Sequence, residues 1–471
     1  LGGGVGSFNL TDDELANLMD GFLSIAIGDN TLNGTGNVDI ETATFTDRVS
    51  IYGGDTTVAG LTSSGTDLLV SSTGSVTVTP TEITQASTIN SNGVSKSLAD
   101  VDGNPAVAFY VPFANDLVFA RNSLPDGTGT WTVQNVDTGG TVGSRPSLAI
   151  VDGNPAISYT DGSNSDLKFA RNTAADGSGS WVIQRVDMVG TVCFYSSLAI
   201  VDGNPAISYH DGTNGDLKFA RNTAADGSGT WVIQSVDTTD NVGRDTSLAV
   251  VNGNPAIEYR DATNGNLKFT RNSAADGNGT WSIASVDTPG NVGQFASLSV
   301  VDGNPAISYS DDTNRDLKFA RNTMADGSGT WVTQTVDMDD DVGHFTSLAF
   351  IDGFPVISYE DRTNFDLKFA RNNAADGSGT WDIQSLDTDG SVGNWTSLAE
   401  VGGSPAIAYT DSSNAQMKYV RIAQSDGISS SGGHVQIVAG DINVLGSVNG
   451  GAMSNVELSG VVTGTPTDVT V

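Results

Sequence analysis

Residues 197–209 have the sequence Ser-Leu-Ala-Ile-Val-Asp-Gly-Asn-Pro-Ala-Ile-Ser-Tyr, residues 216–222 Asp-Leu-Lys-Phe-Ala-Arg-Asn, and residues 224–237 Ala-Ala-Asp-Gly-Ser-Gly-Thr-Trp-Val-Ile-Gln-Ser-Val-Asp. Closely similar sequences recur every 50 residues without insertion or deletion. The copies begin at Ser97, Ser147, Ser197, Ser247, Ser297, Ser347 and Ser397. A fixed period of this length indicates a solenoid, a propeller or an array.

Each copy contains four short strand candidates in which apolar and polar residues alternate. In the third copy these are Ser197–Val201, Pro205–Tyr209, Asp216–Arg221 and Trp231–Val236. Asp-Gly, Gly-Asn and Ser-Gly pairs, which favour turns, separate them. Four strands per repeat predict an all-β propeller with blades of 50 residues, since a helical repeat would need uninterrupted runs of helix-forming residues.

The last copy predicts how the ring closes. It ends after Met417–Arg421 and lacks the fourth strand that begins with Trp in the other copies. A matching segment, Ile83-Thr84-Gln85, precedes the first copy and lies 150 residues before Ile233-Gln234-Ser235. An N-terminal strand that completes the last blade would remove the open edges of the array. We therefore expect a closed ring of seven blades.

The composition is strongly acidic and indicates an exported protein. The formal net charge is −34, and Cys193 is the only cysteine, so no disulfide can form within the chain. Nucleic acid is excluded as a partner because phosphate binding needs Lys and Arg patches. No run of eighteen apolar residues is present, so we expect no membrane span. The chain begins at Leu1, which suggests processing or a fragment of a longer protein.

The two flanks, residues 1–80 and 427–471, differ from the propeller at residues 81–426. A capping-box pattern at Thr11-Asp-Asp-Glu14 predicts one short helix to about Asp20. Brief strands are expected at Asn37–Ile40, Arg48–Tyr52, Asp67–Val70, Ser75–Val78, His434–Val438, Asp441–Val444 and Asn455–Leu458. A sequence pattern of short strands separated by turns predicts a parallel β-helix. The stretch Gly427–Gly433 is expected to be the return linker from the propeller.

A family resemblance in the flanks points the same way. The stretches Leu10-Thr-Asp-Asp-Glu-Leu-Ala-Asn-Leu18 and Gly433-His-Val-Gln-Ile-Val-Ala-Gly-Asp-Ile-Asn-Val444 resemble the filamentous-haemagglutinin-like large exoproteins of bacteria. This resemblance implies a secreted or cell-surface β-helix. Because a closed ring brings its ends together, a propeller can be inserted into such a solenoid at little cost.

Comparison of the copies locates the variable positions. The loops that join strands one to two and three to four barely change, whereas those on the opposite face carry the variation. One variable series, just ahead of the innermost strand, is Ser95, Arg145, Tyr195, Asp245, Phe295, Phe345 and Trp395; its preceding neighbours are Val94, Ser144, Phe194, Arg244, Gln294, His344 and Asn394. The residues expected after the second strand are Tyr110, Thr160, His210, Arg260, Ser310, Glu360 and Thr410, and two positions on come Pro112, Gly162, Gly212, Ala262, Asp312, Arg362 and Ser412.

Three explanations compete for this variation. Exposed loops that drift freely should favour small polar residues, yet four of the seven residues in the first series are aromatic. Aromatic and Arg enrichment is typical of binding hot spots on loops held by a rigid scaffold. Alternatively, the aromatic rings plug the gaps between blades at the mouth of the channel. We favour binding, with candidate ligand-binding residues Arg145, Phe194, Tyr195, His210, Arg244, Asp245, Arg260, Phe295, His344, Phe345, Glu360, Arg362 and Trp395.

The residues that repeat in every blade are expected to be structural. Six Trp residues should pack between blades, and the recurring Arg and Asp should form ion pairs or cap loops. The turn Asp226-Gly-Ser-Gly-Thr-Trp231 is similar to the Asp-box of sialidase-like propellers, although its glycine is displaced and Ala224 replaces the serine. In that family the box is a structural turn, so the resemblance implies a fold of sialidase-like and lectin-like blades and no catalytic residue.

The sequence therefore favours a bacterial extracellular adhesin with a lectin-like propeller on a β-helix stalk. Its expected partner is a glycan or a cell-surface protein, recognised at one composite site because the variable loops do not repeat. The alternative is a structural subunit of a fibre or surface layer that associates through β-helix ends. We expect no enzyme activity, with sialidase-like hydrolysis a minor alternative. No cofactor is expected, but structural Ca²⁺ is possible at Asp337-Met-Asp-Asp-Asp341.

Overall fold

The computed structural model describes most of the chain. The described residues are 24–28, 38–45, 48–63, 67–78, 82–89, 91–192, 194–424, 427–430, 435–444, 447–450, 456–463 and 468–470. The chain divides into two compact units, one made of Leu1–Ile83 with Ala423–Val471 and the other of Thr84–Ile422. The expected helix at residues 11–20 and Cys193 lie outside the described residues.

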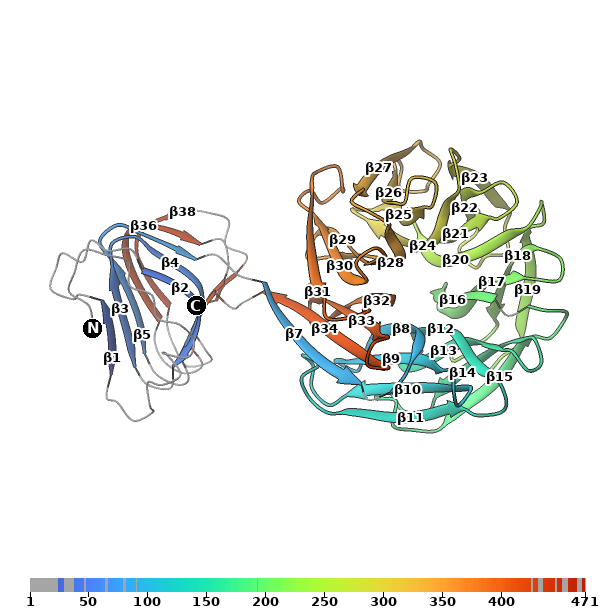
Figure 1. The fold of residues 1–471 in the computed structure, drawn as a ribbon, viewed down its shortest axis with the longest axis horizontal. Coiled ribbons are helices and arrows are strands. Elements are labelled where there is room, and N and C mark those ends of the chain that lie inside the picture. The colour runs from blue at the N-terminus through green and yellow to red at the C-terminus, as the bar shows by residue number, and fades with distance from the viewer. Residues whose placement is uncertain are drawn as a thin grey trace. The chain divides into compact units, whose positions relative to one another are not determined.

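The second unit is a propeller of seven four-stranded antiparallel sheets in its described part (Figure 1). Turn-forming Asp-Gly pairs separate short alternating strands, which is why each copy folds as one meander. The blades consist of β8 (Val94–Val101), β9 (Asn104–Val111), β10 (Asp116–Asn122) and β11 (Trp131–Asp137); β12 (Val142–Val151), β13 (Asn154–Asp161), β14 (Asp166–Asn172) and β15 (Trp181–Asp187); β16 (Phe194–Val201), β17 (Asn204–Asp211), β18 (Asp216–Asn222) and β19 (Trp231–Asp237); β20 (Val242–Val251), β21 (Asn254–Asp261), β22 (Asn266–Asn272) and β23 (Trp281–Asp287); β24 (Val292–Val301), β25 (Asn304–Asp311), β26 (Asp316–Asn322) and β27 (Trp331–Asp337); β28 (Val342–Ile351), β29 (Phe354–Asp361), β30 (Asp366–Asn372) and β31 (Trp381–Asp387); and β32 (Asn394–Val401), β33 (Ser404–Asp411), β34 (Gln416–Gln424) and β7 (Glu82–Ile89).

The last blade confirms the predicted closure. Its strand order is β32-β33-β34-β7, so the N-terminal strand supplies the outer edge. Ile89 of β7 is fully buried in a cluster with Met417 and Tyr419 of the last blade and Phe109 of the first. Trp131 of the first blade also donates a hydrogen bond from Nε1 to Ser87 Oγ of β7. The N-terminal strand of the propeller therefore completes the last blade and contacts the first.

Buried side chains pack between neighbouring blades. Each repeated Trp meets an aromatic ring of the adjacent blade edge to face, with ring centroids 5.1–5.4 Å apart. In one such interface, Phe169 meets Trp231 at 5.2 Å within a core that also contains Leu198, Ile207 and Tyr209. Edge-to-face pairs of this kind add to the stabilisation that burial alone gives. The expected blade-to-blade role of the Trp residues is confirmed.

Polar side chains repeat as a framework beneath these cores. Asp187 accepts hydrogen bonds from Tyr209 Oη at 2.8 Å and Lys218 Nζ at 3.2 Å, and Lys218 also pairs with Asp211 at 2.9 Å. Arg221 donates from Nε to the Val201 carbonyl and so holds the turn after the innermost strand. Because equivalent contacts recur in every blade from the second to the last, the repeated charges are structural, as the sequence predicts.

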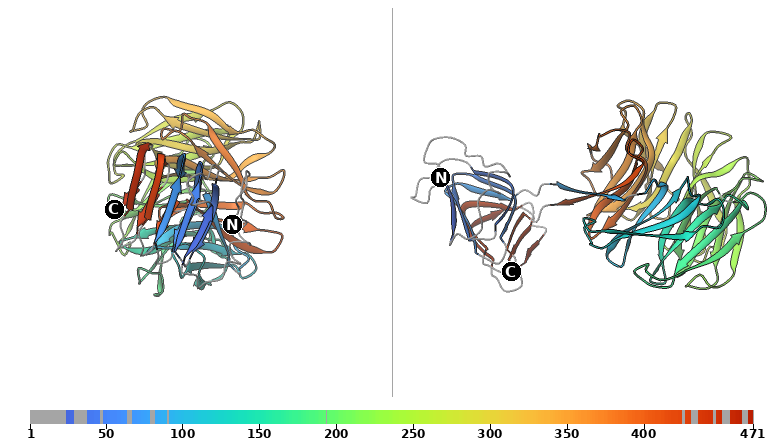
Figure 2. Two further views of the ribbon diagram at one scale, coloured as in Figure 1. Left: turned by 90° about the vertical axis from the view of Figure 1, so that its left-hand side faces the viewer. Right: turned by 60° about the horizontal axis from the view of Figure 1, so that its bottom comes forward.

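The flanking segments form one parallel sheet. Its strands are β1 (Ile25–Gly28), β2 (Val38–Phe45), β3 (Val49–Gly53), β4 (Thr56–Ser63), β5 (Leu68–Ser72), β6 (Ser75–Val78), β35 (Gly427–Ser430), β36 (Val435–Val444), β37 (Ser447–Gly450), β38 (Val456–Thr463) and β39 (Asp468–Thr470). Strands from both sides of the propeller pair directly, since β36 pairs β5 over its first half and β6 over its second. The left view of Figure 2 shows these strands side by side.

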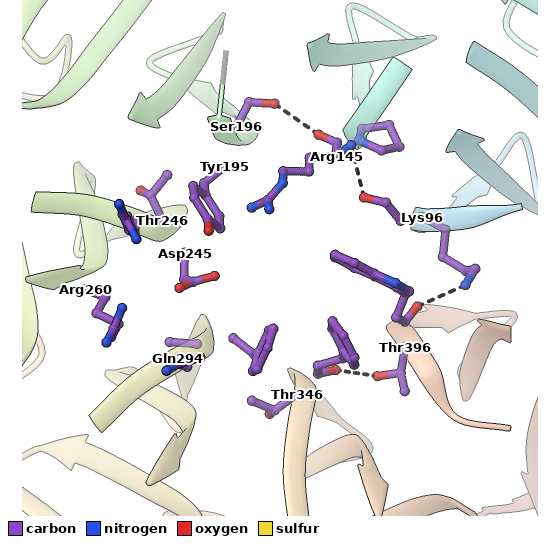
Figure 3. A pocket seen from close by; sticks show the side chains of 17 residues that line it. Lys96, Arg145, Tyr195, Ser196, Asp245, Thr246, Arg260, Gln294, Thr346 and Thr396 are labelled. Atoms are coloured by element: carbon purple, nitrogen blue, oxygen red, sulfur yellow. Dashed lines mark hydrogen bonds between the residues drawn. The ribbon is translucent and has the colours of Figure 1, made fainter. Parts of the chain in front are cut away.

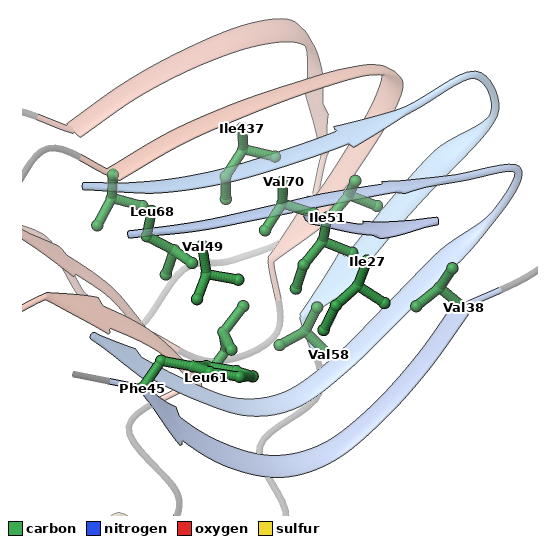
Figure 4. Packing of buried hydrophobic residues seen from close by; sticks show 12 residues of the cluster. Ile27, Val38, Phe45, Val49, Ile51, Val58, Leu61, Leu68, Val70 and Ile437 are labelled. Carbon is green, nitrogen blue, oxygen red and sulfur yellow. The ribbon is translucent and has the colours of Figure 1, made fainter. Parts of the chain in front are cut away.

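Branched aliphatic residues fill the core of this unit. Val49, Ile51, Val58 and Val70 have no exposed surface, and Ile437 of β36 joins them (Figure 4). The alternation of buried and partly buried residues along β3 and β5 directs one face of each strand inward.

The expected strands are therefore present and form a small parallel sheet in the described part of the flanks, and the expected β-helix is not confirmed. The stretch expected as a linker differs, because Gly427–Ser430 is a strand that pairs in parallel with β4. Ile428 lies opposite Leu61 there, so an apolar residue within glycine- and serine-rich text is enough to extend the sheet. No helix in the described part of the chain is long and apolar enough to cross a membrane.

Candidate functional site

A β-bulge at the start of the innermost strand sets the geometry of the variable positions. In β12, Ser144 pairs with Thr160 and Ser147 with Ser158, so Arg145 and Pro146 together face the single residue Tyr159. The extra residue interrupts the ladder and redirects its side chain. Pairing of β20 with β21 and of β24 with β25 shows the same shift.

The bulge places a residue with a side chain in the left-handed region of backbone space. Positive φ values occur at Ser95 (48°), Arg145 (52°), Tyr195 (57°), Asp245 (50°), Phe295 (52°), Phe345 (51°) and Trp395 (54°). This conformation costs roughly 1–2 kcal/mol for a residue other than glycine. Such strain persists only where surrounding structure enforces it, and it concentrates at functional sites.

These seven bulge residues converge on one pocket of about 650 Å³, which we call the central pocket (Figure 3). All seven innermost strands contribute to it. Its lining consists of Ser95, Lys96, Arg145, Pro146, Tyr195, Ser196, Arg244, Asp245, Thr246, Arg260, Gln294, Phe295, Ala296, Phe345, Thr346, Trp395 and Thr396.

One side of the central pocket is an aromatic arc made of Phe295, Phe345 and Trp395. The ring centroids of Phe295 and Phe345 are 4.5 Å apart, and those of Phe345 and Trp395 are 4.4 Å apart. All three side chains are only partly buried. The arc therefore fills space at the ring's centre, as the plug hypothesis requires, and also offers a face to a ligand, as binding requires.

The other side carries a basic arc made of Arg145, Arg244 and Arg260. The Arg145 guanidinium carbon lies 3.7 Å from the centroid of the Tyr195 ring, so a cation–π contact holds this side chain in place. Arg260 donates from Nη2 to Asn291 Oδ1 at 2.7 Å, while its buried Nε has no partner among the described residues.

Asp245 is the one acidic side chain among the residues that line the central pocket. Burial raises the pKa of its carboxyl to about 6, although the charges of Arg145, Arg260 and Arg244 oppose that rise. Three guanidinium groups thus act on one carboxylate, and Figure 3 shows Asp245 beside Tyr195 and Gln294.

Two further ionisable groups depart from the repeat near this pocket. Lys96 Nζ contacts the Trp395 carbonyl at 3.2 Å and donates to Thr410, and burial lowers the pKa of Lys96 well below its usual value. Glu258 replaces the serine found at Ser208 and Ser308, and burial raises the pKa of its carboxyl well above the usual value. The blade next to that of Glu258 has Ala296 at the position where Thr246 and Thr346 stand in other blades. The serine–threonine hydrogen bond that Thr246 and Thr346 form between blades is therefore missing here.

A second, smaller pocket of about 330 Å³, the side pocket, adjoins the first. Its lining consists of Gln294, Phe295, Asp312, Arg315, Asp341, His344 and Arg362. His344 Nε2 lies 3.1 Å from Asp341 Oδ1, and Asp312 accepts hydrogen bonds from Ser310 and Asn291. The acids that line this pocket are therefore already engaged by neighbouring side chains.

The structure brings most of the candidate residues together. Eight of the thirteen line the central pocket: Arg145, Tyr195, Arg244, Asp245, Arg260, Phe295, Phe345 and Trp395. His344 and Arg362 line the side pocket, together with Phe295. Phe194, His210 and Glu360 line neither.

The expected loop placement is wrong for two of the variable series. His210 and Glu360 lie inside second strands and are 4 % and 3 % exposed. They pair across the ladder with Phe194 and His344. The second strand continues past the repeated tyrosine, because the residue that follows the tyrosine pairs with the residue that precedes the bulge. The bulge series lies within the innermost strand for the same reason.

Sequence comparison missed the residue that follows each bulge. Lys96, Pro146, Ser196, Thr246, Ala296, Thr346 and Thr396 all line the central pocket. Most copies have a small or hydroxyl-bearing residue at this position, and such residues are easily attributed to packing. Four of these hydroxyls do bridge blades, since Ser196 contacts Ser158, Thr246 contacts Ser208, Thr346 contacts Ser308 and Thr396 contacts Ser358.

The expected calcium stays untested. Asp337 accepts hydrogen bonds from Tyr359 Oη at 2.7 Å and Lys368 Nζ at 2.8 Å, so its carboxylate belongs to the repeated framework. Among the described residues, no three His, Cys, Asp or Glu side chains are grouped so that they could hold a metal ion.

Comparison with known proteins finds similar folds only. No protein-family model and no curated protein matches this chain. Among solved structures, the NanB sialidase of Streptococcus pneumoniae is 10% identical and aligns over 70% of this chain and 68% of its own, with a TM-score of 0.41. The Hadza microbial sialidase Hz136 is 14% identical over 70% of this chain and 65% of its own, with a TM-score of 0.39. A mutant of the Aleuria aurantia lectin in complex with α-methyl-L-fucoside is 13% identical over 62% of this chain and 95% of its own, with a TM-score of 0.38.

Proposed function

We propose that this protein is an extracellular, cell-surface binding protein of bacterial origin, and that its central pocket recognises a glycan on a partner surface. The observation that carries the proposal is the convergence of the bulge residues. Each blade has one strained bulge position, and the residue there is different in every blade except that Phe occurs twice. All seven side chains line one pocket.

The contrast with the constant residues supports a role in recognition. The repeated Trp, Tyr, Lys, Asp and Arg residues are occupied by contacts within and between blades. The variable side chains converge where the fold does not need a particular residue type. Variation at strained positions on a rigid ring is what a composite binding site requires.

The chemistry of the pocket suits a sugar. The partly exposed rings of Phe345 and Trp395 offer flat apolar surface on which the CH face of a sugar ring can lie. Gln294, which precedes Phe295 in β24, and Thr246 of β20 provide an amide and a hydroxyl group in the same lining. The lining therefore combines apolar rings with hydroxyl, amide and charged groups, as a ligand with both apolar faces and polar substituents requires.

The flanking sheet supports a stalk in the same proposal. Parallel pairing of β36 with both β5 and β6 stacks strands from before and after the propeller, as rungs of a β-helix would. The edge strands β1 and β39 close the strand order of the described sheet. Stacking at such edges is the basis of the alternative, a fibre or surface-layer subunit.

A glycan array tests the proposal. The intact chain should bind a subset of glycans, and the triple variant Phe295→Ser, Phe345→Ser and Trp395→Ser should lose binding by more than tenfold, because aromatic anchors contribute about 2 kcal/mol or more each. The control variant Phe113→Ser and Phe365→Ser removes exposed rings, 87 % and 49 % accessible, that line neither pocket.

The control should bind as the intact chain does. A triple variant that melts far lower but binds normally per folded molecule would show that the aromatic arc is a plug. Filaments in the purified protein, together with an empty array, would favour the fibre subunit.

A further inference from the structure

The basic side chains of this acidic protein are unevenly placed. Of its 21 Lys and Arg residues, thirteen stand at two repeated positions, with an Arg in all seven blades and a Lys in six of them. The described contacts engage these thirteen in the framework: Lys218 bridges Asp187 and Asp211, and Arg221 holds the Val201 carbonyl. Eight basic residues remain outside the repeat.

These eight residues separate into two groups. Arg48 pairs with Asp67 at 2.9 Å, and Arg185 lies 3.6 Å from Asp166. The other six gather at the two adjoining pockets, with Lys96, Arg145, Arg244 and Arg260 at the central pocket and Arg315 and Arg362 at the side pocket. A chain with a net charge of −34 thus concentrates its non-repeated cations at one place.

We infer, on the basis of the proposed function, that the ligand of the central pocket is an anionic glycan whose carboxylate or sulfate group is held by Arg145, Arg244 and Arg260 while its sugar ring lies on the aromatic arc.

The contacts of the three arginines leave them available for an anion. None forms a salt bridge with a described residue, in contrast to the six repeated lysines and to Arg48 and Arg185. Stacking on Tyr195 fixes the plane of the Arg145 guanidinium and leaves its edge donors for a planar or tetrahedral anion. Arg260 retains a buried Nε–H without a described partner.

The charge balance agrees with this assignment. Asp245 is the only carboxylate among the residues that line the central pocket, and three guanidinium groups act on it. The central pocket therefore has a net positive charge, and most of the other charges of the protein are negative. For this reason the pocket attracts an anion chiefly at short range. Screening by salt should therefore weaken binding only in part.

Matched probe pairs test the inference by isothermal titration. The carboxylate pair is tri-galacturonic acid and its methyl ester, and the sulfate pair is 6-sulfo-N-acetyllactosamine and N-acetyllactosamine. In at least one pair the charged probe should bind more than tenfold more tightly than its neutral partner. The pair that shows the difference identifies the type of anion.

Variants then locate the anion. Arg145→Gln and Arg244→Gln should each abolish the preference, so that the charged probe binds no more tightly than its neutral partner. Arg185→Gln, which removes an outer-strand arginine with 54 % of its side chain exposed, is the matched control and should keep the preference. A melting curve for each variant confirms that the ring is folded.

Each outcome decides between the two proposals. Equal affinity within both pairs would overturn the anionic assignment and leave glycan binding standing. A preference that survives both substitutions but is lost in Arg185→Gln would place the anion elsewhere and overturn the assignment. If none of the four probes binds the intact chain at millimolar concentration, the anionic assignment falls, and the glycan array decides separately whether glycan binding stands.

Discussion

At the scale of single residues, the bulge explains how a repeat protein can present a non-repeating surface. Gly143 has a φ of 99°, and a Cβ there would lie 2.6 Å from the Leu117 backbone, so a side chain at Gly143 would be strained. Two residues later Arg145 adopts a left-handed conformation with its side chain in the central pocket. The backbone is fixed by constant residues, and the side chain at the bulge is free to vary.

Backbone strain at the bulge gives a prediction that needs no ligand. Phe345→Gly and Phe345→Ala both remove the ring, but only glycine adopts a φ of 51° without a steric penalty. The Gly variant should therefore be more stable than the Ala variant by about 1 kcal/mol. Urea denaturation of the two variants measures the difference. An Ala variant that is equally or more stable would contradict the left-handed assignment.

The buried acids predict an unusual dependence of stability on pH. Burial raises the pKa of Glu360 from 4.5 to about 7, so between these values the folded state binds more protons than the unfolded state. Stability should therefore fall as pH rises through this window. Glu360→Gln should remove a loss on the order of 2 kcal/mol between pH 5 and pH 8. Denaturation at both pH values checks this, and identical pH profiles for variant and parent would contradict it.

At the scale of the blade, a buried lysine bridge links neighbouring blades at six of the seven interfaces, because the first blade has Val118 at the lysine position. Lys218 sits between Asp187 of the preceding blade and Asp211 of its own, with only 12 % of its side chain exposed. The two carboxylates and the Tyr209 hydroxyl form one connected group around it. Such a group specifies how adjacent blades meet, since each member loses its partners if the blades shift.

Removal of that lysine should be costly for stability and neutral for binding. Lys218→Met leaves two buried carboxylates without their cation, which typically costs about 3 kcal/mol or more. The exposed pair of Arg48 with Asp67 is the comparison, and Arg48→Gln should cost less than about 1 kcal/mol. Chemical denaturation of both variants tests the contrast. Equal losses would mean that the bridge does not stabilise the interface.

The elements show what sequence comparison could and could not predict. Gap-free copies fix the strand count, the turns and the packing of the Trp residues, because each feature repeats and its period is directly visible. The bulge cannot be seen this way, since the extra residue is present in every copy and leaves no insertion. For that reason His210 and Glu360 were expected in loops, although both are buried strand residues.

At the scale of the whole molecule, the chain combines a closed ring with an interrupted parallel sheet. The first and last parts of the sequence form one unit, because Gly427–Ser430 continues the ladder of Thr56–Ser63. Sequence patterns predicted these strands individually, but not their partners, because short strands in glycine- and serine-rich text lack features that specify pairing. Closure of the ring was predictable because the missing fourth strand left a gap in an otherwise regular repeat.

Ring closure predicts that β7 is essential for stability although it lies outside the repeat. Replacing residues 82–89 with a Gly/Ser linker of equal length removes the buried Ile89 and the partner of Trp131. The substituted chain should melt several degrees lower, because the last blade loses an edge strand and its contact with the first. Calorimetry measures the shift. An unchanged melting temperature would show that the ring does not depend on this strand.

The central claim is that seven different side chains form one recognition site at the centre of the ring. Its most direct test is the stoichiometry of a bound glycan, measured by isothermal titration with the intact chain and any array-positive sugar. One site per chain is expected, since the bulge residues line a single pocket and no two neighbouring blades present the same pair of residues there. Six or seven equivalent sites per chain would contradict the account, because such binding could arise only from the residues that repeat in every blade.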